Sequence, residues 1–236
     1  AASRYTVPFD VQAGTDLDIV GGKGANLGRL TQAGFAVPPG FVVGTEAYKA
    51  HIKDLKERIA DALSSINYAD ANALEESVQR IRSWIVEVDM PAAIANEIAA
   101  GYAGLGDKIF VAVRSSGTAE DLDGASFAGL HDTYLDIRGR DCVIDAVKRC
   151  WASLWTARAV SYRKTQGFEQ FPSIAVVVQT MVESEVSGVM FTGNPINTAT
   201  DQILINASWG LGEAIVSGIV TPDEYLVRHK TLKVLE

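Results

Sequence analysis

Residues 109–121 read Ile-Phe-Val-Ala-Val-Arg-Ser-Ser-Gly-Thr-Ala-Glu-Asp, and this stretch decides the fold class. Its apolar first half predicts a buried strand that ends at Arg114. An arginine at a strand end, followed by hydroxyl-bearing and small residues, is well suited to clamp phosphate oxygens. For Glu120 and Asp121 two interpretations are open, because a carboxylate here either approaches a metal ion or caps a helix.

On the C-terminal side of this strand, the sequence alternates predicted strands and helices. Residues 123–134 are small and glycine-rich, and a segment of this length without apolar periodicity favours a functional loop over a simple connection. A helix is predicted at 142–157 with a continuation to 167, and the further predicted strands are 134–137, 173–181, 186–192, 202–207 and 224–228.

The strand at 173–181 ends in Gln179 and Met181. A glutamine at a strand end can read the edge of an adenine while a methionine packs on its face, or it can be a polar residue of an edge strand. Farther along, the glycine turn at 206–213 either positions backbone near a triphosphate or only joins a strand to a helix, and Glu213 is a candidate metal ligand.

Near the N-terminus, Gly21-Gly22-Lys23-Gly24 precedes a helix predicted from Ala25 to Gly34. Glycines let backbone N–H groups approach an anion, the helix N-terminus adds positive potential, and Lys23 supplies a mobile cation. The spacing of a Walker A loop is absent. A tight turn with an exposed lysine explains the same residues, so phosphate binding and a structural turn both remain open.

Residues 45–104 carry apolar side chains at helical spacing and predict a hairpin or insert of two or three helices. We therefore expect a mixed α/β (α+β) protein in which 1–44 and 105–236 form one region and 45–104 form a small helical subdomain.

The composition of the chain limits which classes of partner it can bind. The chain has 236 residues, 21 basic and 29 acidic side chains and a net charge of −8, so it lacks the basic surface that nucleic acids and anionic membranes attract. No apolar run reaches the length of a membrane span, and a cytoplasmic location is expected. Its three histidines are isolated, which disfavours a zinc site, and a serine hydrolase elbow is absent.

Taken together, the motifs resemble the N-terminal ATP-binding domain of the phosphoenolpyruvate synthase, pyruvate phosphate dikinase and rifampin phosphotransferase family. The resemblance runs in order through nearly the whole chain. It rests on residues 21–27, 37–41, 113–116, 119–122, 125–129, 187–192, 209–213 and 222–225.

This resemblance implies an ATP-grasp-like fold and a dikinase reaction. ATP is cleaved to AMP and phosphate, and its β-phosphate passes through a phosphohistidine to an acceptor. The resemblance also implies ATP and Mg²⁺ as the bound groups, and no magnesium ligand is assigned. Lys23 and Arg114 would clamp the triphosphate and take part in catalysis, Gly129 and Thr133 would lie in the loop over the phosphates, and Gln179 would help to hold the nucleotide.

The family's later acidic and nucleotide-binding segment has no match after Tyr225, and the phosphohistidine and acceptor domains are absent. We therefore expect an ATP-binding region without its last strands, whose histidine domain belongs to the same chain or to a separate subunit and which by itself does not complete the reaction. The acceptor could be pyruvate, an antibiotic hydroxyl, a phenol or another alcohol. A competing interpretation is a regulatory or interaction module that keeps the fold without catalysis.

Overall fold

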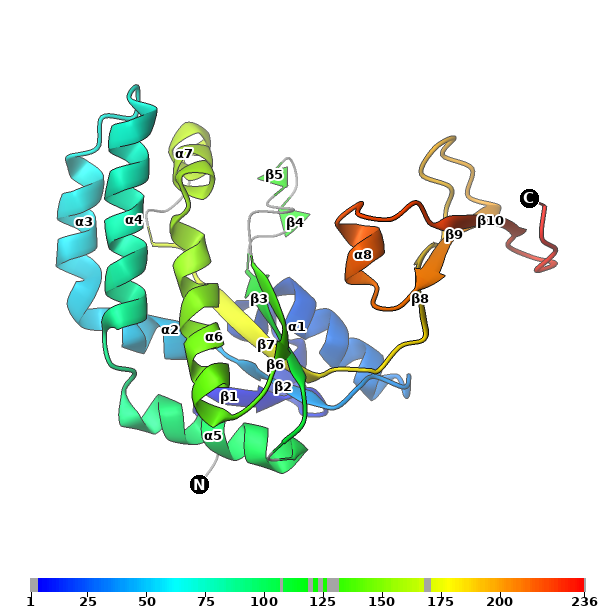
Figure 1. Ribbon diagram of the computed structural model, residues 1–236, viewed down its shortest axis with the longest axis horizontal. Coiled ribbons are helices and arrows are strands. Elements are labelled where there is room, and N and C mark those ends of the chain that lie inside the picture. The colour runs from blue at the N-terminus through cyan, green and yellow to red at the C-terminus, as the bar shows by residue number, and fades with distance from the viewer. Residues whose placement is uncertain are drawn as a thin grey trace. The chain divides into compact units, whose positions relative to one another are not determined.

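The structure, a computed structural model, describes residues 4–106, 108–118, 121–122, 125–126, 132–167 and 171–235. The chain divides into two compact units, Ala1–Met181 and Val182–Glu236. Each unit has its own antiparallel sheet, which makes the protein α+β, in agreement with the sequence (Figure 1).

The first unit is built on a five-stranded sheet with the order β1-β2-β7-β3-β6, in which every neighbouring pair is antiparallel. Its central strand, β7, is a run of β-branched residues buried on both faces, as expected for a strand covered by helices on each side. The strands are β1 (Thr6–Pro8), β2 (Gly40–Val43), β3 (Val111–Gly117), β6 (Thr133–Ile137) and β7 (Ile174–Thr180). A separate two-stranded ladder pairs β4 (Asp121–Leu122) with β5 (Ala125–Ser126).

Strand β3 differs from its prediction in a way that matters for the site. The sequence predicted that the strand ends at Arg114, but it continues to Gly117 because residues 115–117 pair with Val176, Ala175 and Ile174 of β7. Arg114 therefore lies in the middle of the strand, where its side chain is fixed to one face of the sheet.

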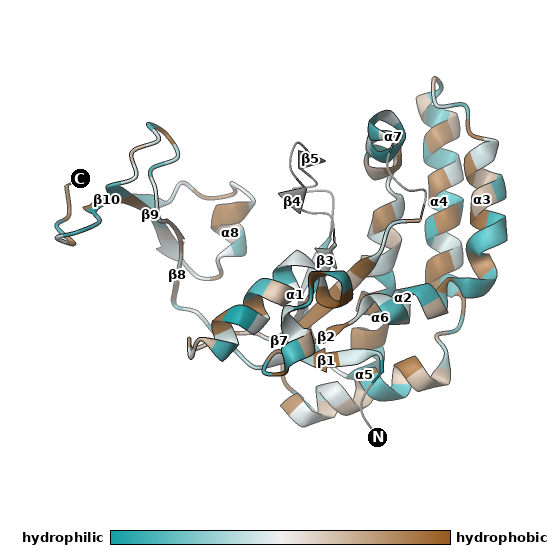
Figure 2. Cartoon of the chain, turned by 180° about the vertical axis from the view of Figure 1, so that it is seen from behind, coloured by the Kyte–Doolittle hydropathy of each residue, from teal (hydrophilic) through white to brown (hydrophobic). Residues whose placement is uncertain are grey.

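Helices account for most of the rest of the first unit. In Figure 1, α3, α4 and α6 stand in a row beside the sheet, and along α4 brown and teal bands alternate in Figure 2, as in an amphipathic helix. The α-helices are α1 (Leu17–Gln32), α2 (Thr45–His51), α3 (Lys56–Ser64), α4 (Ala71–Glu87), α5 (Ala92–Leu105), α6 (Arg140–Ala152) and α7 (Ala157–Gln166). Short 3₁₀ turns are η1 (Gln12–Thr15), η2 (Lys53–Leu55) and η3 (Ser153–Trp155).

The two faces of the sheet carry different cores. Val176 and Val178 of β7 join the large core formed with α2–α6, whereas Ala175 and Val177 join a small core with Val20 of α1. This division follows from the two-residue period of a strand. We call the side with the small core the α1 face.

The predicted division into 1–44 with 105–236 and a subdomain at 45–104 stays a prediction, and the boundary that the structure marks lies between Met181 and Val182. Helices α2–α5 share the large core with the sheet. None of the helices within the described ranges is both long and apolar enough to cross a membrane.

The second unit is a three-stranded antiparallel sheet with the order β10-β9-β8. Its strands are β8 (Val186–Phe191), β9 (Gln202–Trp209) and β10 (Asp223–Arg228), and the short helix α8 (Glu213–Val216) follows β9. Asn194 is buried and donates from Nδ2 to Oε1 of Gln202, which ties the connection after β8 to the start of β9.

His51, at the end of α2, is a buried histidine inside the large core, with its ring 4.8 Å from the ring of Trp151. Its Nε2 lies 2.8 Å from the carbonyl oxygen of Ile85, so Nε2 carries the proton and donates it. Nδ1 has no hydrogen-bond partner among the described residues. Burial lowers the pKa of His51, the Ile85 hydrogen bond opposes this, and the charge of Lys148 adds to the lowering.

We expect acid to destabilise the protein through His51. Above the unfolded-state pKa of about 6.5 both states hold a neutral ring, and as the pH falls below it the unfolded state binds a proton that the folded state resists. The free energy of unfolding should fall by up to about 1.4 kcal/mol per pH unit in this range. Urea unfolding between pH 7.5 and 5.5 should show a shallower fall in His51→Gln.

The matched control is His229→Gln, because His229 is exposed in the second unit. This control should keep the pH dependence of the native chain. Equal pH slopes for the native chain and His51→Gln would contradict the assignment.

Candidate functional site

Helix α1 is interrupted at Gly21, which adopts φ 68° and ψ 177°, a region open almost only to glycine. The sequence predicted a turn over residues 21–24 and a helix from Ala25. The helix instead begins at Leu17, and the non-helical conformation is confined to Gly21. Lys23 therefore lies in the first turn after the break, where backbone N–H groups of a helix start and a cation occur together.

Ser116 of β3 holds this break in place. Its hydroxyl donates to the carbonyl of Val20 at 2.8 Å and accepts from the N–H of Gly24 at 3.1 Å. A Cβ at Gly21 would collide with the backbone oxygen of Ser116. The sequence suggested that the hydroxyls after Arg114 clamp phosphate, but the Ser116 hydroxyl is buried and occupied by α1, so its role is structural.

Arg114, Gln179 and Thr133 project from the α1 face. Arg114 pairs across the sheet with Val177 on one side and with Thr133 on the other, and residues directly opposite in an antiparallel pair share a face. Gln179 lies opposite Ala112, two residues before Arg114 and hence on the same face. The sheet therefore brings together three of the predicted residues from separate parts of the chain.

The guanidinium of Arg114 is held by an amide. Its Nη2 donates to Oε1 of Gln179 at 2.5 Å, and Nε2 of Gln179 donates to the carbonyl of Pro38 at 3.0 Å. Nε of Arg114 is buried and has no hydrogen-bond partner among the described residues. Burial lowers the pKa of Arg114, because leaving water disfavours the charged form.

The guanidinium of Arg114 is therefore a cation that can still bind an anion. Five N–H groups of a guanidinium form a fork that matches carboxylate or phosphate oxygens, and here one neutral amide oxygen takes up only part of it. Arg114 is a half-buried charge with no carboxylate partner in the described part of the chain, and such a charge strongly favours binding of an anionic ligand. Because Oε1 of Gln179 faces Arg114, Gln179 acts in the site by holding the guanidinium.

Lys23 is half-buried on α1, the helix that packs on β3 and β7. Its ammonium is one of the charges that lower the pKa of the buried Cys150 thiol, whose Sγ lies 3.7 Å from the carbonyl of Val113. Lys23 thus adds positive potential near β3. Burial outweighs this effect and raises the pKa of Cys150 overall.

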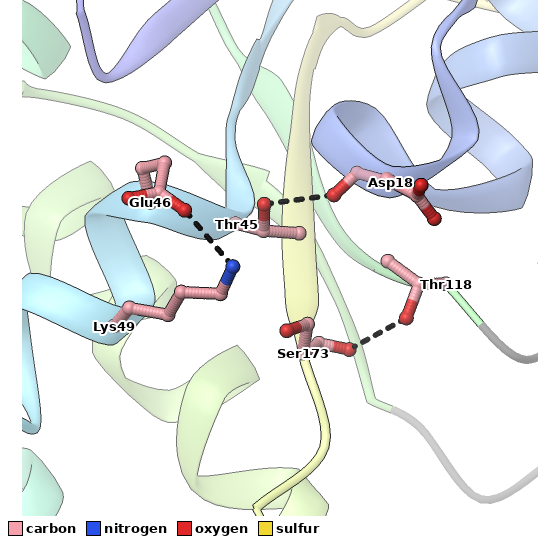
Figure 3. Close-up of polar contacts among 6 residues, drawn as sticks. All are labelled: Asp18, Thr45, Glu46, Lys49, Thr118 and Ser173. Carbon is pink, nitrogen blue, oxygen red and sulfur yellow. Dashed lines mark hydrogen bonds and ion pairs between the residues drawn. The ribbon is translucent and has the colours of Figure 1, made fainter.

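Side-chain hydrogen bonds to backbone fix the ends of the elements around this site (Figure 3). Thr45 at the start of α2 donates to the carbonyl of Asp18 at 2.8 Å, which anchors the part of α1 before the break. Thr118 donates to the carbonyl of Ser173 at 3.3 Å, extending the contact of β3 with β7 by one residue beyond the strands. The first contact fixes α1 to the start of α2, and the second fixes the end of β3 to the start of β7.

A family model with the description "Pyruvate phosphate dikinase, AMP/ATP-binding domain" matches residues 17–236. The chain belongs to this family. Its fold is accordingly ATP-grasp-like, as the sequence motifs implied.

The names of similar proteins agree with this family. The chain is 48% identical to a probable phosphoenolpyruvate synthase of Pyrococcus abyssi and 46% identical to the phosphoenolpyruvate synthase of Pyrococcus furiosus, with all of the chain and 34% of each relative covered. A probable phosphoenolpyruvate synthase of Methanocaldococcus jannaschii is 46% identical over 99% of the chain and 20% of the relative. The chain thus spans about a third or less of the length of these relatives.

Two of the residues singled out in the sequence have no described position. Gly129 and Glu120 lie outside the described residues. Glu213 opens α8 in the second unit and is exposed. Within the described ranges, no group of three or more histidine, cysteine or acidic residues forms a metal site. The roles of Lys23, Arg114, Thr133 and Gln179 in binding stay predictions.

The sequence did not predict which residues hold Arg114 and the α1 break in place. The link from Pro38 through Gln179 to Arg114 joins residues that are 141 and 65 positions apart, and the hydroxyl of Ser116 reaches α1 across 92 positions. The segment Val37-Pro38-Pro39-Gly40 was among the family motifs of the sequence. Only the antiparallel pairing of β2 with β7 shows that the carbonyl of Pro38 lies beside Gln179.

Proposed function

We propose that the chain is the ATP-binding part of a dikinase-type phosphotransferase, with the triphosphate bound on the α1 face between the α1 break and Arg114. The observation that carries this proposal is the Arg114 guanidinium, which is held in place by Gln179 and has no carboxylate partner among the described residues. Membership in a family of AMP/ATP-binding domains supports the nucleotide as the anion.

The chain's own groups have distinct tasks in this proposal. Arg114 binds phosphate oxygens and neutralises charge that develops on the transferred phosphoryl group, and Lys23 adds a second, mobile cation. Thr133, exposed and opposite Arg114, offers a hydroxyl at the same place. Gln179 keeps the guanidinium oriented before ligand arrives, which lowers the cost of ordering it on binding.

The reaction that we propose converts ATP, water and an acceptor to AMP, inorganic phosphate and the phosphorylated acceptor. The γ-phosphate goes to water and the β-phosphate goes first to a histidine on another domain or subunit. Mg²⁺ would neutralise phosphate charge when bound. An acceptor such as pyruvate, the histidine-bearing partner, the inability of this chain alone to complete the reaction and a cytoplasmic location all stay predictions.

Calorimetric titration of the chain with MgATP tests the proposal. We expect saturable binding that weakens about tenfold or more in Lys23→Ala, because a charged hydrogen bond to phosphate is lost. Lys53→Ala is the matched control, since Lys53 is exposed on η2, and it should bind like the native chain. Equal affinities in the two variants would overturn the role of Lys23, and no binding by the native chain would overturn the proposed function.

Phosphorus NMR of the same samples distinguishes the reaction class. Because the histidine that takes the β-phosphate is proposed to lie on another domain or subunit, we expect the chain alone to leave ATP intact. Accumulation of ADP would contradict the proposed reaction even if ATP binds.

A further inference from the structure

A second buried arginine, Arg163 of α7, lies apart from the α1 face. Only 6% of its surface is exposed, and its guanidinium stands over the ring of Trp155, 5.3 Å from the ring centroid. Burial lowers the pKa of Arg163 to about 10, while Tyr48 and Tyr68 act in the opposite direction. The side chain therefore still carries its positive charge at neutral pH.

The guanidinium of Arg163 has no acceptor in the part of the chain that the structure describes: no hydrogen bond or ion pair joins this side chain to a described residue. Buried arginines are normally paired, because an unpaired buried charge is costly. Two partly buried arginines near α4 and α6 do lie beside carboxylates, since Arg82 lies 2.7 Å from Glu75 and Arg149 lies 2.8 Å from Asp145. Arg163 differs from both, because no carboxylate of a described residue lies beside it.

The guanidinium borders a cavity of about 170 Å³ between α3, the segment before α4, η3 and α7. A second cation borders it too, because the Lys164 ammonium lies 5.5 Å from the centroid of the Tyr68 ring. None of the described residues that line the cavity is acidic. Most of the remaining wall is aliphatic or aromatic, with Leu63, Tyr68, Trp155 and Val160.

The cavity is therefore positively charged at one end and largely apolar elsewhere. A cavity of about 150 Å³ is known to hold a molecule of benzene's size, so this one has room for about six non-hydrogen atoms. We propose that it binds a small oxyanion, a carboxylate or phosphate group on an apolar body of a few atoms, with Arg163 and Lys164 as its cations. The site shares no residue with the α1 face and does not depend on nucleotide binding there.

A bound oxyanion would supply hydrogen-bond acceptors to the guanidinium of Arg163. The guanidinium fork of Arg163 would gain acceptors while its flat face stays against Trp155, whose Nε1 donates to the hydroxyl of Tyr48 at 3.0 Å. Trp155 is fully buried and is fixed by this bond, so its indole N–H reports on the cavity wall. Trp155 is thus a natural probe for occupancy.

The experiment is an NMR titration of the full chain with inorganic phosphate, acetate and butyrate, each at constant ionic strength maintained with sodium chloride. The chain has four tryptophans, and Trp155→Phe identifies the Trp155 indole signal. We expect a saturable shift of that signal. Phosphate acting more strongly than the carboxylates would identify a phosphate group as the ligand chemistry, whereas butyrate acting more strongly than acetate and phosphate would identify a carboxylate on an apolar body.

Three variants make the test specific. Arg163→Gln should weaken binding about tenfold or more, because a charged hydrogen-bond donor is lost. Lys164→Gln changes an exposed side chain that does not threaten folding and should weaken binding less. Arg158→Gln, at an exposed position of the same helix, should stay within about twofold of the native affinity.

Thermal unfolding gives an independent readout. The anion should raise the melting temperature of the native chain, and at the same anion concentration it should raise that of Arg163→Gln less, since a ligand stabilises the state that binds it according to its affinity. Arg114→Ala should keep the Trp155 shift, which separates this cavity from the α1 face. The proposal is overturned if no anion gives a saturable Trp155 shift, which would mean that water alone fills the cavity, or if Arg163→Gln responds like the native chain.

Discussion

Replacing Gly21 by alanine is expected to lower the free energy of unfolding by about 3 kcal/mol or more. Two causes add. The backbone at φ 68° and ψ 177° is open almost only to glycine, and a Cβ there would meet the backbone oxygen of Ser116, which cannot rotate away. Urea unfolding of the native chain and the variant measures the difference.

Gly34→Ala separates the two causes. Gly34 also has a positive φ, 82°, but a Cβ there would meet no atom within 4 Å, so only the backbone cost of about 1–2 kcal/mol is expected. Equal losses in the two variants would show that the contact of α1 with Ser116 is not tight. Gly21→Ala should also weaken ATP binding, because Ser116 lies two residues from Arg114 on the same face of β3.

Arg114→Ala is expected to weaken binding of MgATP by about 1.5–3 kcal/mol, roughly tenfold to more than a hundredfold. The free energy of unfolding should change far less, because the guanidinium is half-buried and bonded only to the amide of Gln179 among the described residues. Calorimetry gives the affinity and urea unfolding gives the stability. Arg29→Ala is the control, since Arg29 is exposed near the end of α1.

Gln179→Glu is a second test of Arg114, because it places a negative charge beside the guanidinium on a side chain of nearly the same shape. The new carboxylate would pair with Arg114 and neutralise the cation that is proposed to bind phosphate. The carboxylate cannot donate to the carbonyl of Pro38 as the native amide does, and this loss offsets the gain from the new ion pair. We expect a free energy of unfolding within about 1–2 kcal/mol of the native one and ATP binding that is about tenfold weaker. Undiminished binding in both Arg114→Ala and Gln179→Glu would place the triphosphate elsewhere.

Local patterns were enough for much of the fold. A short, valine-rich apolar run predicted β7 to within a residue at either end, and apolar spacing predicted α4 and α5, because these signals are local in the sequence. The end of β3 was mispredicted, because Ser115, Ser116 and Gly117 have low strand preference and are held only by pairing with β7. The start of α1 was mispredicted for a similar reason, since only Gly21 departs from helical geometry and the contacts of Ser116 with Val20 and Gly24 hold the helix on both sides of it.

The sequence by itself determined which side chains are available for the site and which family the chain resembles. Lys23, Arg114 and Gln179 were named from motifs and spacing, because phosphate chemistry restricts the residue types that serve it, and Thr133 was named from the family resemblance. Only the tertiary structure decided what holds them. The bonds from Pro38 to Gln179 to Arg114 join distant segments of the chain. Arg163, whose side chain has no partner among the described residues, lies beside a cavity because of how α7 packs. Local sequence determines neither the partners of a side chain nor its burial.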